Sequence, residues 1–200
     1  MAGLLESLYG TDTETVDQIR AYTGDDSERA EQAYGAAAGT ILRGVEKTSQ
    51  TKEGAASILE MIHKQVEDGN VRTDSTSREG GVQVRDMKPE AVNQMMKAIF
   101  GENAPNVEGG LAKVISLDPE TSKKVFAKVL PGVLGRVFGA TDRHPDQNLE
   151  ALPKVVADAR QEMERQQPRS AGIFKAILDQ DHDGDVDLKD LMGLIGRKPK

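Results

Sequence analysis

Aspartate recurs at short, regular intervals near the C-terminal end of the chain, in a pattern that could hold a hard cation. The stretch 179–190 places aspartates at loop positions one, three, five, seven, nine and twelve, which are Asp179, Asp181, Asp183, Asp185, Asp187 and Asp190. Ca²⁺ takes six to eight oxygen ligands in a flexible cage, and loops of the EF-hand type supply them from these positions. The spacing therefore predicts a Ca²⁺ site whose ligands come from these six residues.

The other loop positions fit the same pattern. Gly184 stands at position six, where the chain turns sharply, and Val186 stands at position eight, where an apolar residue fixes the loop to a core. Asp185 is expected to ligate through its backbone carbonyl, and Asp187 directly or through a water. Asp190 differs from the usual glutamate at position twelve, and its shorter side chain can lose the bidentate contact. Because Mg²⁺ prefers fewer, monodentate carboxylates, it is the expected competitor.

The sequence shows no second kind of reactive site. It contains no cysteine, which excludes disulfides, zinc–thiolate sites and cysteine nucleophiles. His63, His144 and His182 have no ligand spacing among them, and neither a nucleophile elbow nor a phosphate-binding loop is present. We therefore predict that the protein is not an enzyme and has no catalytic residue.

Charge and hydropathy restrict the partners and the compartment. The net charge is −7, and such a surface repels phosphate backbones, so we expect no nucleic-acid partner. No apolar run approaches the ~20 residues that a membrane-spanning helix needs. The first residues lack a basic segment followed by a long apolar run, so we expect no secretory signal. These features predict a cytoplasmic protein without membrane contact.

Apolar residues at helical spacing, separated by glycine and proline, predict an all-α fold that must position the loop. We expect a short helix over 13–23, a long helix after 25–27 and a third helix after 49–52. A helix over 88–100 and a long helix opening at 118–120 should follow, with charged helical sequence at 162–167. Pro131 should kink the second long helix, because its ring removes a hydrogen bond. The expected core residues are Val16, Ile19, Ala30, Ala33, Tyr34, Ala37, Ala38, Ile41, Leu42, Val45, Ala55, Ile58, Leu59, Ile62, Val92, Met95, Met96, Ile99, Phe100, Leu111, Val114, Ile115, Val125, Phe126, Val129, Leu130, Val133, Leu134, Val137 and Phe138.

The two halves of the chain resemble each other. A shift of 93 positions pairs Asp25 with Asp118, Gly39 with Gly132, Arg43 with Arg136, Thr48 with Thr141, Leu59 with Leu152 and Ile62 with Val155. Each copy would contain a short, a long and a third helix, which predicts an internal repeat. We therefore expect a first repeat at 1–65, a polar linker at 66–86, a second repeat at 87–167 and a C-terminal EF-hand-like or dockerin-like module at 168–200. The repeats would pack as one domain or as a loosely linked pair.

The second repeat, with Pro131 to Gly135, and the Asp-rich loop resemble the YidB-like bacterial family of unknown function. The first repeat departs from it, having Ala38 where Pro131 stands in the second. The resemblance implies a helical bacterial protein and provides no catalytic residue.

The sequence thus predicts a non-enzymatic Ca²⁺-binding protein in which the ion orders the C-terminal module, for internal structure or for contact with a protein partner or a second copy of the chain. A structural role is favoured over a sensor, since sensors usually pair their loops. Two alternatives stay open: Ca²⁺-dependent partner binding of the dockerin kind, in which loops also carry aspartate at position twelve, and an enzyme with a site between the repeats.

Overall fold

A computed structural model describes residues 13–70, 88–141 and 148–166, and every regular element in these ranges is helical. Helix α2 spans Thr13–Arg20, α3 Ser27–Thr48 and α4 Lys52–Glu67; α5 spans Pro89–Phe100, followed by the 3₁₀ turn η1 at Gly101–Asn103; α6 spans Ala104–Val114, α7 Pro119–Thr141 and α8 Asn148–Gln166. The all-α prediction is confirmed for the described ranges. The predicted module at 168–200 lies outside them.

The two long helices begin at aspartate caps. The Asp26 carboxylate accepts the Arg29 backbone N–H at 3.1 Å, and Asp118 accepts that of Thr121 at 3.0 Å. Such caps satisfy amide groups that have no partner within the helix. Asp26, rather than Asp25, therefore caps α3 as Asp118 caps α7. The first residues of the two helices, Ser27 and Pro119, are 92 positions apart, one fewer than the predicted shift of 93.

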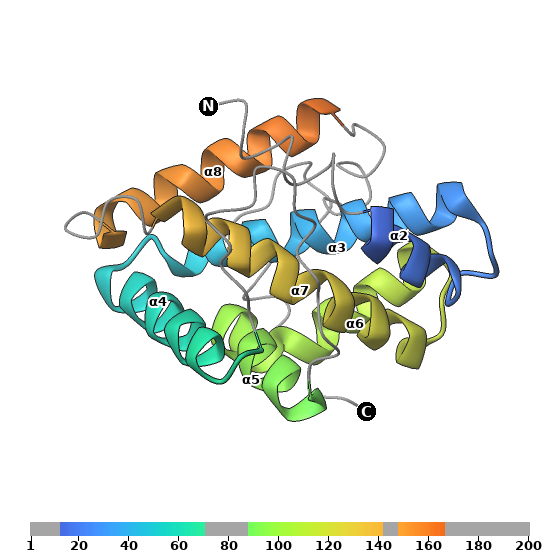
Figure 1. Cartoon of the computed structure of the whole chain (residues 1–200), viewed down its shortest axis with the longest axis horizontal. Coiled ribbons are helices and arrows are strands. Elements are labelled where there is room, and N and C mark those ends of the chain that lie inside the picture. The colour runs from blue at the N-terminus through green and yellow to red at the C-terminus, as the bar shows by residue number, and fades with distance from the viewer. Residues whose placement is uncertain (1–12, 71–87, 142–147, 167–200) are drawn as a thin grey trace.

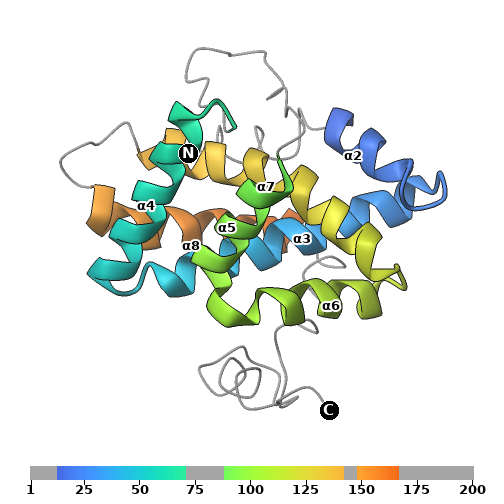
Figure 2. The same cartoon turned by 90° about the horizontal axis from the view of Figure 1, so that it is seen from below.

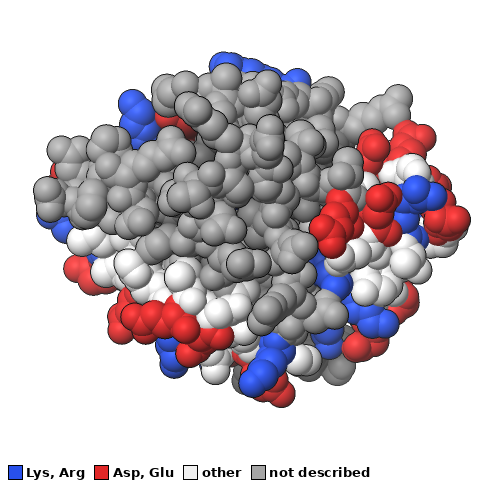
Figure 3. Space-filling view, viewed as in Figure 1, with Lys and Arg blue, Asp and Glu red and all other residues white. Residues whose placement is uncertain are grey.

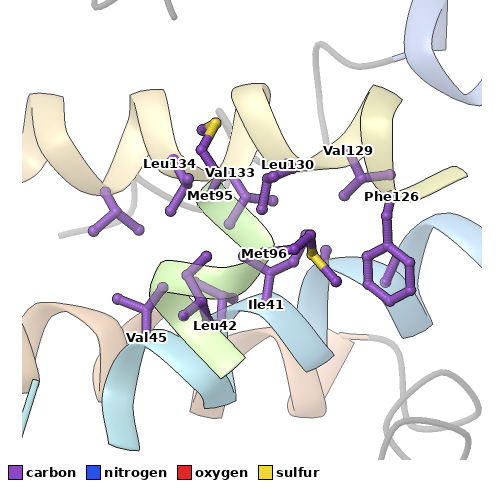
Figure 4. Packing of buried hydrophobic residues seen from close by; sticks show 14 of the residues in the cluster. Ile41, Leu42, Val45, Met95, Met96, Phe126, Val129, Leu130, Val133 and Leu134 are labelled. Carbon is purple, nitrogen blue, oxygen red and sulfur yellow. The ribbon is translucent and has the colours of Figure 1, made fainter. Parts of the chain in front are cut away.

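Helices α3 and α7 lie side by side at the centre, and the other elements cover them (Figure 1). Figure 2 shows α5 between α4 and α6, beneath this pair. Figure 4 shows Ile41, Leu42 and Val45 of α3 facing a row of α7 side chains, with Met96 of α5 inserted between them. Residues from both predicted repeats thus contribute to one hydrophobic core.

Nearly all described members of the predicted core are buried, and Val16 packs against the core while partly exposed. Burial differs within one predicted pair: Ile62 of α4 is buried, whereas Val155 of α8 is only half-buried. The buried stripe of α8 instead consists of Leu152, Val156, Ala159 and Met163. These residues advance by alternate steps of four and three, which is the spacing that keeps one helix face toward its neighbour.

Small residues allow α3 and α5 to approach closely. A Cβ at Gly44 of α3 would lie 2.4 Å from a ring carbon of Phe100, so α5 packs directly on this glycine. The Thr48 hydroxyl donates to the Ile99 carbonyl at 2.8 Å and fixes the same contact. Glycine at position 44 and threonine at position 48 thus seat the end of α5 on α3.

The helix boundaries refine the predicted organisation. Helix α4 extends to Glu67, so its last turn takes in the first two positions of the predicted 66–86 linker. The span 87–167 contains α5 in addition to α6, α7 and α8. Helix α7 continues through Pro131, and α8 contains Pro153. The kink at Pro131 stays a prediction.

Candidate functional site

The six aspartates of the predicted Ca²⁺ loop, Asp179, Asp181, Asp183, Asp185, Asp187 and Asp190, lie outside the described residues. Within the ranges 13–70, 88–141 and 148–166, no group of three or more histidine, aspartate or glutamate side chains is placed to hold a metal ion. His63 is exposed on α4, and His144 and His182 are outside the described ranges. The sequence pattern of the loop remains the basis for the metal site.

A buried cation lies between the two central helices. The Arg136 side chain of α7 is only 7% exposed, and its guanidinium donates to the Tyr34 hydroxyl of α3 at 3.3 Å. Burial of a charge requires polar neighbours, because removing it from water is costly. Sequence alignment of the two halves singles out Arg136 as the counterpart of Arg43 but gives no sign that it is buried. This contact joins α3 and α7 in the interior.

A network of alternating charges joins α3 to α8. One carboxylate oxygen of Glu46 accepts from Arg160 Nε at 2.7 Å and from Arg43 Nη1 at 3.0 Å. Arg160 also pairs with Glu164, one turn further along α8. The side chains of Glu46 and Arg160 are each 14% exposed, so solvent screens the network weakly. The sequence analysis missed it, because its members come from positions far apart in the chain.

The network changes the acidity of its central arginine. Burial alone would lower the pKa of Arg160, but the hydrogen bond and charge of Glu46, with the charge of Glu164, outweigh it and raise the pKa above its ordinary value. Arg160 is therefore a permanent cation, and its chemistry is ion pairing rather than proton transfer.

Replacing Glu46 by glutamine should destabilise the fold measurably. The variant removes the negative charge shared by Arg43 and Arg160 and leaves two cations close together at a half-buried position. We expect a loss of about 2 kcal/mol in the free energy of unfolding, between the values typical of surface and buried pairs. Urea denaturation followed by circular dichroism measures it.

Glu120→Gln is the matched control. Glu120 pairs with Lys123 on the surface of α7, where the side chains are 76% and 53% exposed, and we expect a change below ~0.5 kcal/mol. Equal losses in the two variants would contradict a stabilising role for the network.

Further polar contacts close the ends of the helices. The Arg29 guanidinium of α3 donates to the Ile115 carbonyl at 3.0 Å and also to the Ser116 carbonyl, at the end of α6. Lys124 lies 5.7 Å from the centre of the Tyr22 ring, a cation–π contact between α7 and the turn that follows α2. The side-chain and backbone hydrogen bonds from Thr121 lower the pKa of Asp118. These contacts cap and join helices, which is a structural role.

The pKa of Glu108 in α6 shifts upward, opposite to that of Asp118. Burial raises its pKa, Lys123 opposes the effect and Glu120 adds to it. Because the folded pKa lies above the unfolded one, the stability that the protonated group contributes is complete below the ordinary pKa of 4.5 and is lost as the pH rises through the folded pKa.

Glu108→Gln should therefore raise the melting temperature slightly at pH 7, relative to the native protein, and this gain should disappear well below pH 4.5. Calorimetric melting at both pH values measures the difference, and Glu53→Gln on the exposed face of α4 is the control for the substitution itself. A gain that persists unchanged in acid would show that burial of the charge is not its cause.

Most of the described helical body matches one family model. Residues 6–139 match the model described as a bacterial protein of unknown function, DUF937. The chain belongs to this family. The DUF937 match includes α2 to α6 and nearly all of α7, and it therefore contains the Arg136–Tyr34 contact. Arg160, Glu164 and the Asp-rich loop lie beyond the matched range.

The match confirms the predicted relation to a bacterial family of unknown function, while the YidB-like grouping stays a prediction. The chain matches no curated protein and no solved structure with significance. Among the described helices, none combines the length and apolar character required to span a membrane. On the described part of the face in Figure 3, basic and acidic side chains are interspersed.

Proposed function

We propose that this DUF937 protein is a non-enzymatic Ca²⁺-binding protein whose ion orders a C-terminal module at 168–200. The proposal is carried by the sequence of the loop 179–190, where aspartates occupy six ligand positions, five of them expected to ligate through the side-chain carboxylate, with Gly184 and Val186 in register. An acidic surface turn would also account for the many aspartates, but it would not require glycine at position six or an apolar residue at position eight.

The electrostatics of the loop support a role for the ion in folding. Without a cation, six carboxylates within twelve positions repel one another, so the metal-free loop should be poorly ordered. Binding then brings the acids together, and its free energy becomes folding free energy for the module. The sequence carries one such loop, and we therefore propose a structural ion rather than a paired sensor.

The described helical body ends shortly before the predicted module in the sequence. Helix α8 ends at Gln166, shortly before the predicted module, and the ion network with Glu46 ties its last turns to α3. We propose that α2 to α4 and α6 to α8 are two copies of one three-helix unit, with α5 between them in the chain. Helices α3 and α7 have matching aspartate caps and end at positions related by the predicted shift, Thr48 and Thr141.

A calorimetric Ca²⁺ titration of chelator-stripped, full-length protein tests the proposal. We expect one saturable site with a Kd of about a micromolar or tighter. Asp183→Asn removes the charge at position five and should abolish that site, whereas Asp158→Asn, on the exposed face of α8, should leave it unchanged. Heat no greater than that of dilution at millimolar Ca²⁺ would refute the proposal.

The aspartate at position twelve favours a second candidate function, Ca²⁺-dependent association of the dockerin kind. If Asp190 reaches the ion through one oxygen, the site has a smaller cage and Mg²⁺ should weaken the apparent Ca²⁺ affinity. Sedimentation of the full chain with Ca²⁺ and with chelator distinguishes the roles. A dimer formed only with Ca²⁺ indicates self-association, while a monomer in both conditions, together with tight binding, supports an internal structural ion or a different partner.

A further inference from the structure

We draw no further inference here: the strongest candidate, the buried contact between Arg136 and Tyr34 at the interface of α3 and α7, is accounted for as a polar link within the helical core, and nothing among the described residues shows a ligand or partner that would reach it.

Discussion

Gly54→Ala should destabilise this protein by about 3 kcal/mol, although alanine is the better helix former. Gly54 lies in the first turn of α4, and its amide donates to the Thr51 hydroxyl at 3.0 Å. A Cβ there would stand 1.9 Å from the backbone carbonyl oxygen of Thr48. Backbone atoms cannot yield as a flexible side chain can, so the α3–α4 corner must open. Urea denaturation measures the loss.

Gly109→Ala is the matched control, because the same methyl group is added to another helix. Gly109 lies in α6, and a Cβ there meets nothing within 4 Å. With no clash to offset it, alanine's higher helix propensity should stabilise the protein by about 0.5–1 kcal/mol. The two variants should therefore change stability in opposite directions. A loss of similar size in both would show that the α3–α4 corner does not determine the effect.

Leu152→Ala should cost about 3 kcal/mol in the free energy of unfolding. Leu152 is fully buried on α8, within the stripe that packs this helix against the core. Truncation removes apolar contacts and leaves a cavity that the surrounding helices fill only in part. Because α8 carries few large apolar residues on its inner face, one truncation removes a large share of the apolar contacts between α8 and the rest of the core. Chemical denaturation and thermal melting both measure this loss.

Leu149→Ala, one turn earlier on the same helix, is the control. Leu149 is 44% exposed, so its removal should change the stability by less than ~0.5 kcal/mol. The two substitutions share their chemistry and their helix, and they differ mainly in burial. Similar effects in both variants would contradict the packing of α8 through Leu152.

Local patterns were sufficient to predict most of the helices. The starts of α3 and α7 follow aspartates, and the end of α5 falls before Gly101, whose φ of +60° suits glycine. Apolar spacing identified the inner faces of α3, α4, α5 and α7, because an amphipathic helix has a single face that can leave water. On α8 the predicted shift paired Val155 with Ile62, which is buried, and the structure buries the adjacent Val156 more fully than Val155.

Contacts between distant helices were beyond such patterns. Glu46, Arg43 and Arg160 look like ordinary surface charges in a helical sequence, and only the packing of α8 on α3 brings them into one half-buried network. The sequence pattern likewise gives no reason to expect Arg136 in the interior, and it is the packing of α3 against α7 that buries it beside Tyr34. Charged side chains carry no periodic signal that reports burial, so their surroundings follow from the tertiary arrangement.

The sequence by itself determined the helical class, the inner faces and the Asp-rich loop pattern, because each depends on residues close together in the chain. The tertiary structure decided how α3 and α7 pair, where α5 sits on Gly44, and which charges are shielded from water. Those features depend on the approach of helices far apart in the sequence. The way these distant helices pack together depends on the sum of many side-chain contacts, and the spacing of residues within one helix does not predict it.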